Sequence, residues 1–260
     1  LSPRRRFPVR AAALALAMLA LAAVALYVFA TRSRSIDSIA VLPLANAGGN
    51  PDMEYLSDGL TDNLINTLSQ LPPLRVAGRS LVYRYKGKDT DPLQIGRDLK
   101  VRAVVTGRVT QRGDTLTVQA ELLDVSDGSQ LWGQQYQRRL SDLGALQEEI
   151  ARQISGKLRP RLSGGSPKLP GRRYTDNVEA YQAYLKGRHH AYKYTADGAR
   201  KALDYFQQAI SSDPNYAPAY AAIAEVYCLG TLLSPDSLPR AKAAATTALR
   251  LDDNLAEAHT

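Results

Sequence analysis

The sequence predicts an α/β sandwich with a mixed sheet of about five strands, followed by an all-α solenoid and preceded by one transmembrane helix. An uncharged amino-terminal stretch, alternating strand and helix patterns, and a 34-residue periodicity support this prediction. The expected segments are a cytosolic basic tail (1–10), a transmembrane helix (11–31), a tether (32–37), the α/β domain (38–162), a linker (163–173) and the repeats (174–260).

The amino-terminal stretch from Ala11 to Ala30 contains no charged residue. At a rise of about 1.5 Å per residue, about 20 apolar residues cross a hydrocarbon core about 30 Å thick. Four arginines precede this stretch and only Arg32 and Arg34 closely follow it. Because positive charge favours the cytosolic side, the sequence predicts a single-pass inner-membrane protein with a cytosolic amino terminus and an extracytoplasmic bulk. A cleaved signal peptide ending near Ala30 is the alternative.

The net charge is concentrated at the amino terminus. The chain has 33 basic and 25 acidic residues, and six of the arginines but none of the acids lie in residues 1–34. The remainder is therefore almost balanced, and no basic stripe interleaved with aromatic residues indicates a nucleic-acid partner. The single cysteine, Cys228, excludes an intrachain disulfide framework.

The elements of the α/β domain follow from periodicity and from turn and cap residues. Asn50 and Pro51 are typical of a helix start, Pro72-Pro73 ends that helix, and Asp127-Gly128 favours a hairpin turn. Apolar residues alternate with polar ones from Leu116 to Leu122, as in a sheet wetted on one face. The predicted strands are 39–44, 74–77, 101–110, 115–124 and 130–138, and the predicted helices are 53–71, 91–99 and 143–158.

The carboxyl third carries the register of a helical repeat. Ala202 and Ala209 allow a neighbouring helix to approach, Phe206 fills the space between them, and Pro214 ends the helix. This register resembles the tetratricopeptide repeat. A third repeat begins at Ala256 and the sequence then stops, so we expect a fragment of a longer protein. The resemblance places four residues on a partner-binding groove: Pro218, Ala221, Glu225 and Cys228.

The α/β region also resembles a known domain. The matching stretches are 38–46, 54–61, 85–89, 103–108, 131–133 and 146–151. They look like the TolB amino-terminal type (FlgO-like) domain. That domain, followed by tetratricopeptide repeats, is common in the extracytoplasmic part of bacterial receptor serine/threonine kinases and also occurs beside adenylate cyclase domains. The resemblance implies an architecture and carries no catalytic residues.

No motif in the chain predicts catalysis, a metal site or a cofactor. The three histidines cannot be assigned to a catalytic triad, and His189 and His190 are adjacent, so on a helix they diverge by about 100°. We interpret this histidine pair as helix surface. Trp132 and Tyr136 share one strand face, where they serve either core packing or a ligand platform.

Three functional hypotheses follow. In the first, the chain is a non-catalytic sensor region of a membrane-anchored signalling protein, a fragment of a serine/threonine kinase or cyclase receptor. The repeats would bind a protein or peptide, and the α/β domain would dock or form a homodimer. The second is a freestanding cell-envelope scaffold for assembly of a protein complex. The third is an enzyme built in the α/β domain, which would need a polar pocket that the sequence does not reveal.

Overall fold

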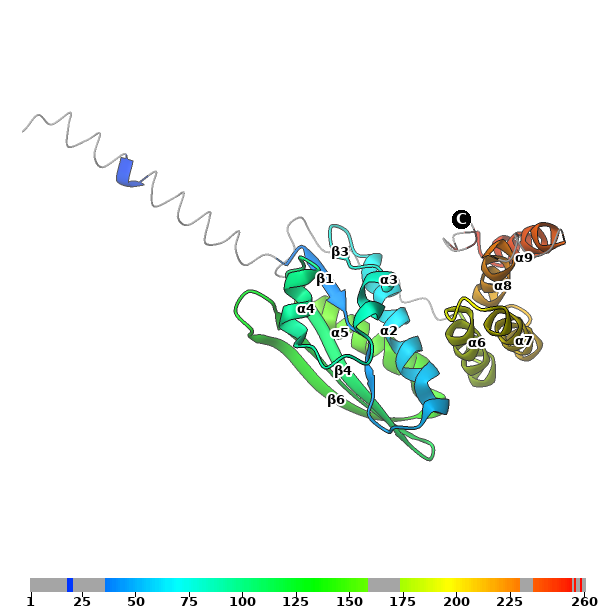
Figure 1. Ribbon diagram of the computed structural model, residues 1–260, viewed down its shortest axis with the longest axis horizontal. Helices are drawn as coiled ribbons and strands as arrows, with labels where there is room; N and C mark the ends of the chain where they lie inside the picture. The colour runs from blue at the N-terminus through cyan, green and yellow to red at the C-terminus, as the bar shows by residue number, and fades with distance from the viewer. Residues whose placement is uncertain are drawn as a thin grey trace, which may run out of the picture.

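The computed structural model describes residues 18–20, 36–158, 174–229, 236–253, 255 and 258. Residues 38–158 form a sheet covered by helices, which we call the sandwich, and residues 178–251 form two pairs of helices (Figure 1). The predicted tail at 1–10 and linker at 163–173 lie outside the described residues.

The sheet is mixed and has six strands. Its strands are β1 (Ser38–Val41), β2 (Ala45–Asn46), β3 (Arg75–Val76), β4 (Ala103–Arg112), β5 (Thr115–Asp124) and β6 (Gln130–Arg139). The order is β3-β1-β4-β5-β6. β2 pairs with β4 at Arg108 and Val109, beyond the part of β4 that pairs with β1. β1 lies parallel to β3 and β4, whereas β4, β5 and β6 are antiparallel.

The predicted caps and turns form as expected. The Asn50 side chain accepts a hydrogen bond from the Asp52 amide at 3.0 Å and begins η1 (Pro51–Met53), which continues into α2 (Glu54–Ser69). The Asp91 side chain accepts one from the Leu93 amide at 3.1 Å and begins α4 (Pro92–Asp98). Such bonds satisfy amides that a helix start leaves without partners. Gly128 adopts a φ of 74° in the turn before β6, a conformation that favours glycine.

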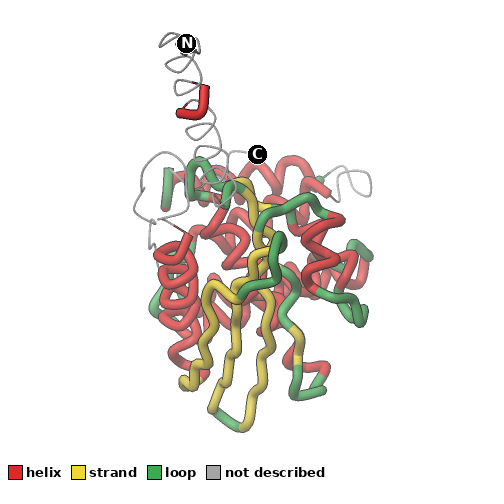
Figure 2. The backbone as a smooth tube through the Cα atoms, turned by 90° about the vertical axis from the view of Figure 1, so that its left-hand side faces the viewer, coloured by secondary structure: helices red, strands yellow, loops and turns green. Residues whose placement is uncertain are grey.

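The core lies between the sheet and two long helices, α2 and α5 (Leu143–Leu158), as Figure 2 shows from the side of the strands. β5 alternates buried and half-buried residues, as its sequence predicts. Trp132 and Tyr136 are buried in this core, and the Trp132 indole donates to Gln153 at 3.1 Å. Of the two interpretations of this aromatic pair, core packing is therefore confirmed.

The two helix pairs are α6 (Val178–Ala191) with α7 (Ala196–Ser212), and α8 (Ala217–Leu229) with α9 (Ser237–Leu251). The predicted packing within the first pair is confirmed, because Ala202, Phe206 and Ala209 are fully buried. A Cβ atom at Gly187 would lie 2.4 Å from the Phe206 ring, so only glycine allows α6 and α7 to approach this closely.

The predicted fold class needs correction in the sheet, which has six strands instead of about five. The missed strand, β2, is two residues long and too short to show alternation. The segment after β3 also contains α3 (Arg79–Val82) and η2 (Tyr83–Tyr85), and α5 follows η3 (Leu140–Asp142). These short elements have too few residues for a helical period to be recognised.

The predicted tetratricopeptide-repeat solenoid is also corrected. The described residues contain two helix pairs, and a tetratricopeptide-repeat solenoid is not seen among them. A repeat solenoid buries each unit against its neighbours and needs at least three of them. Here α6 packs against α2 of the sandwich, so the sheet domain covers apolar surface that another repeat would cover in a solenoid.

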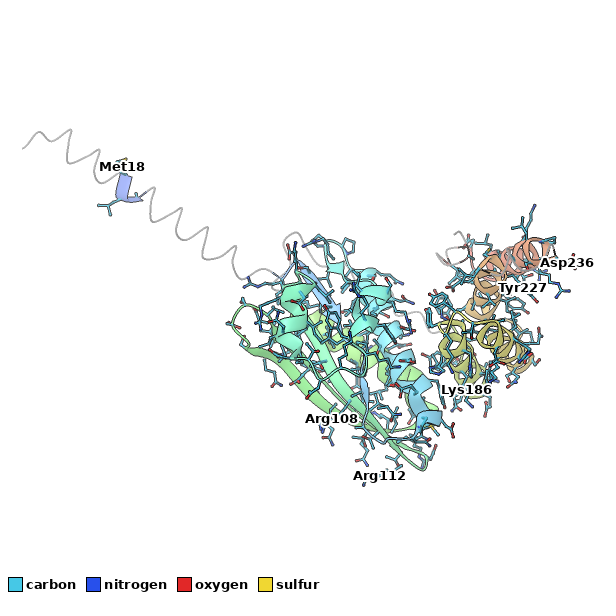
Figure 3. The ribbon with its side chains drawn as sticks, in the orientation of Figure 1. Met18, Arg108, Arg112, Lys186, Tyr227 and Asp236 are labelled. Carbon is cyan, nitrogen blue, oxygen red and sulfur yellow. The ribbon has the colours of Figure 1, made fainter. Side chains whose placement is uncertain are left out.

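The prediction of a single-pass membrane protein is contradicted as well. Among the residues that the structure describes, no helix combines the length and the apolar character needed to cross a membrane. Of the predicted span at 11–31, only Met18–Ala20 is described, and it is helical (Figure 3). The rest of that span and the tether up to residue 35 lie outside the described residues.

Candidate functional site

The most distinctive site is the joint at which α6 rests on the sandwich. Leu185 of α6 is 4% exposed and belongs to the hydrophobic core of the sheet domain. It lies directly over Gly59 of α2, where a Cβ atom would stand 2.7 Å from the Leu185 methyl carbon. Because Gly59 has no side chain, the Leu185 side chain enters the core of the sandwich. The sandwich and α6 therefore share apolar packing.

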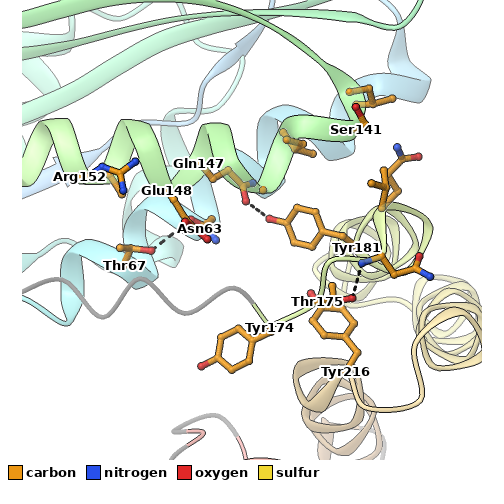
Figure 4. A pocket seen from close by; sticks show the side chains of 17 residues that line it. Asn63, Thr67, Ser141, Gln147, Glu148, Arg152, Tyr174, Thr175, Tyr181 and Tyr216 are labelled. Carbon is orange, nitrogen blue, oxygen red and sulfur yellow. Dashed lines mark hydrogen bonds between the residues drawn. The ribbon is translucent and has the colours of Figure 1, made fainter.

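A cleft of about 160 Å³ opens at this joint, between α5, the end of α2 and the start of α6 (Figure 4). The Tyr181 hydroxyl crosses from α6 and donates a hydrogen bond to the Gln147 side-chain oxygen on α5. Gln147 is 1% exposed, and its amide nitrogen has no hydrogen-bond partner among the described atoms. Gln147 therefore contributes its side-chain oxygen to the contact between α5 and α6.

A buried ionic cluster ties three segments of the chain together at the joint. Asp58 of α2 is 5% exposed and lies 2.8 Å from His189 Nδ1 of α6. Its other oxygen accepts a hydrogen bond from the Lys86 ammonium, which also pairs with Glu54 at 2.8 Å. Burial by itself would raise the pKa of the Asp58 carboxyl, but the hydrogen bonds from His189 and Lys86 outweigh it and the pKa is lowered. The cluster therefore holds Asp58 in its charged form.

A second ionic group lies one turn further along α2. Arg79 of α3 pairs with Asp62 at 2.6 Å, and its guanidinium lies between two aromatic rings, 3.5 Å from Tyr83 and 3.4 Å from Tyr192. Burial raises the pKa of Asp62 although Arg79 opposes it, the reverse of the shift at Asp58. The stacked arginine connects the sandwich to the residue that follows α6.

These contacts continue to the second helix pair. Arg188 of α6 donates a hydrogen bond to the Tyr192 hydroxyl and pairs with Glu225 of α8 at 2.6 Å. The positive charge of Arg188 also acts on Asp62 of α2. Arg79, Tyr192 and Arg188 therefore form a continuous path of contacts from Asp62 to Glu225.

The four predicted groove residues all lie on α8, in different environments. Ala221 is buried against neighbouring helices, Pro218 is half-buried, and Glu225 and Cys228 are exposed. Glu225 is the one whose ion pair leads to the joint. The partner-binding role of these residues remains a prediction. Of the four, Glu225 and Cys228 are the ones whose side chains are exposed.

The interpretation of the histidine pair as helix surface is wrong for His189, because its side chain is 21% exposed and bonded to Asp58. These two residues are 131 positions apart, and no local pattern in the sequence connects them. Burial lowers the pKa of the neighbouring His190, whose ring stacks on Tyr205 at 5.5 Å. Within the described ranges, no group of three or more histidine, cysteine or acidic residues could hold a metal ion.

Comparison with known proteins gives one matching family model and one relative of similar sequence. Residues 34–153 match the family model of the HilA/YgeH-like transcriptional regulator, second domain. The chain is 30% identical over 227 residues to a Rhizobium meliloti (strain 1021) protein named "Putative adenylate cyclase 3". That match covers 85% of this chain, which spans only 39% of the length of its relative.

Similar solved structures include TolB from Acinetobacter baumannii, at 17% identity and a TM-score of 0.36, covering 48% of this chain and 29% of TolB. Lipoprotein GNA1162 from Neisseria meningitidis is 22% identical at a TM-score of 0.35, covering 47% of this chain and 99% of the lipoprotein. Each of these two similarities covers about half of this chain.

Proposed function

We propose that this chain is a non-catalytic regulatory region of a signalling protein, in which a protein or peptide bound at α8 alters the joint between the helix pairs and the sandwich. The match to a protein named as an adenylate cyclase supports a signalling context, with a cyclase as the enzyme that the region would regulate. The match to a transcriptional-regulator domain also supports a regulatory role.

The observation that carries this proposal is the continuous path from Glu225 to Asp62. Glu225 is exposed on α8, yet its partner Arg188 contacts Tyr192, whose ring stacks on Arg79 of the sandwich. A partner that binds Glu225 with its own cation would compete with Arg188. Arg188 would then interact more strongly with Asp62 or leave Tyr192, and either change alters the contacts that hold the joint.

The non-catalytic part of the proposal rests on how the polar residues of the joint are used. Each oxygen of the Asp58 carboxylate accepts a hydrogen bond, one from His189 and the other from Lys86, and Lys86 is shared with Glu54. A general base or acid needs an atom free to exchange a proton with a substrate. The polar groups of this cluster instead bind one another between packed helices, which suits a structural connection.

The test uses Cys228, the only cysteine, as an attachment point for a photo-crosslinker in the full chain. A matched control carries Cys228→Ser with Ala243→Cys, which moves the probe to an exposed position on α9. We expect a partner that crosslinks from position 228 and not from 243, and that speeds amide hydrogen exchange in α2 and α6 when it binds. Equal crosslinking from both positions, or binding that leaves exchange in α2 and α6 unchanged, would refute the proposal.

A further inference from the structure

The cleft at the joint has walls from both parts of the chain. Asn63 and Thr67 belong to α2, Gln147 belongs to α5, and Tyr181 and Gln182 belong to α6 (Figure 4). Small-molecule sites commonly lie between two packed bodies of this kind. A cavity of about 150 Å³ holds one benzene molecule. The cleft, at about 160 Å³, therefore has room for one six-membered ring.

Gln147 has hydrogen-bonding capacity left for a ligand. A carboxamide offers an oxygen and an NH₂ group, and the Tyr181 hydroxyl occupies the oxygen. The amide nitrogen has no partner in the part of the chain that the structure describes, although the residue is 1% exposed. Buried polar groups in proteins are nearly always hydrogen-bonded, so an acceptor placed in the cleft would complete this side chain.

Two further carboxamides line the cleft, and they come from opposite walls. Asn63 of α2 accepts a hydrogen bond from Thr67 at 3.4 Å, and its amide nitrogen donates to no described residue. The Gln182 side chain of α6 likewise forms no hydrogen bond within the described ranges. Carboxamides both donate and accept, so they suit a ligand that does the same.

The remaining lining residues favour a flat and uncharged ligand. Three tyrosines, Tyr174, Tyr181 and Tyr216, contribute rings to the cleft, and aromatic rings pack well against another ring (Figure 4). Glu148 and Arg152 are the charged residues of the lining, and they lie four residues apart on α5. Because their charges are opposite, the lining has no net charge that would attract an ion.

We propose that this cleft binds a small neutral aromatic compound, one ring in size, that carries a carboxamide or a similar donor and acceptor group. The acceptor of the ligand meets the Gln147 amide, and its ring packs against the tyrosines. Such a ligand contacts α5 and α6 together and so stabilises the docked arrangement of the joint. The cleft is lined by no residue of α8, so this proposal does not rest on the proposed partner site there.

The first measurement uses nicotinamide, a single pyridine ring with a carboxamide, as the probe. It is titrated into the ¹⁵N-labelled full chain, and the side-chain amide signals of Gln147, Asn63 and Gln182 are followed by NMR. We expect saturable shifts with a dissociation constant of about 1 mM, as for a ligand of this size. Nicotinate, which has the same ring with a carboxylate, should bind at least about tenfold more weakly, because burying its charge is unfavourable. Equal or tighter binding of nicotinate would overturn the choice of a neutral ligand.

Three variants locate the binding. Thr67→Trp fills the cleft from a half-buried position of α2, and Asn66→Trp adds the same ring at the exposed neighbouring position, which does not line the cleft. Gln147→Leu removes the free donor. We expect nicotinamide to bind about tenfold or more weakly to Thr67→Trp and Gln147→Leu, and normally to Asn66→Trp.

Thermal melts show which variants fold, and if Gln147→Leu does not, the two tryptophan variants decide the result. The inference is overturned if nicotinamide gives no saturable shift up to about 20 mM, where a 1 mM site is nearly full. It is also overturned if Thr67→Trp binds as tightly as Asn66→Trp. Because neither result depends on crosslinking at Cys228, failure here leaves the proposed partner site on α8 standing.

Discussion

Replacing Asp58 with asparagine tests the ionic cluster most directly. Asp58 accepts hydrogen bonds from His189 at 2.8 Å and from Lys86, and hydrogen bonds to a charged group contribute about 1.5–3 kcal/mol each. Asparagine keeps one acceptor oxygen, and Lys86 keeps its pair with Glu54 at 2.8 Å. About half of the combined contribution should therefore be lost, which lowers the free energy of unfolding by about 2 kcal/mol.

The assay is urea unfolding followed by the fluorescence of Trp132, the only tryptophan, which is buried in the sandwich. Asp37→Asn is the matched control, because Asp37 is 59% exposed and lies 3.9 Å from Arg75. Such a surface pair contributes about 0–1 kcal/mol. If Asp58→Asn costs no more than this control, the cluster does not hold the joint and the reasoning fails.

The same variant should change how stability depends on pH. The pKa of Asp58 is below its ordinary value of 3.8, so its charged form stabilises the folded state. That contribution is complete above pH 3.8 and is lost as the pH falls through the lower pKa of the folded state. The difference in stability between the wild type and Asp58→Asn should therefore shrink below pH 3.8 in urea titrations. A difference that stays constant into that range would contradict the assignment.

Three further substitutions test the packing and the polar contacts of the joint. Gly187→Ala places a Cβ atom 2.4 Å from the Phe206 ring, which should lower the free energy of unfolding by about 2 kcal/mol and with it the melting temperature. An unchanged melting temperature would show that α6 and α7 can move apart without loss. Tyr181→Phe removes the hydroxyl that donates to the Gln147 side-chain oxygen. This change should lower the free energy of unfolding by about 1–2 kcal/mol and speed hydrogen exchange in α6; unchanged stability and exchange would show that the bond does not hold the joint. Asp62→Asn should cost less than the Asp58 variant in urea unfolding, because burial raises the pKa of Asp62 and disfavours its charge; an equal or larger loss would contradict this order.

Elements that depend on neighbouring residues were predictable from sequence. The cap at Asn50, the turn at Asp127-Gly128 and the alternation along β5 each involve residues within one element, and all three occur in the structure. The burial of Phe206 between two alanines follows from helical spacing in the same way. β2 escaped prediction because two residues carry no period.

The candidate site could be predicted only in part. The four groove residues were assigned from the repeat register, and all of them do lie on α8. Their connection to the sandwich was missed, because Glu225 reaches it through Arg188 of another helix. His189 was likewise assigned to the surface, since neither its neighbours nor its spacing shows that Asp58 lies opposite.

By itself, the sequence determined the positions of most strands and helices, the apolar stripes of α2 and α5 and the packing of α6 on α7. Local hydrogen bonds and periodic burial are encoded within a few turns of chain, so they can be recognised without knowing the fold. Only the tertiary structure decided how many helix pairs the described residues form, that the sandwich buries part of α6, and which charges meet at the joint. The contact between Asp58 and His189 exists only after α6 docks over Gly59, because docking joins residues that are 131 positions apart in the chain.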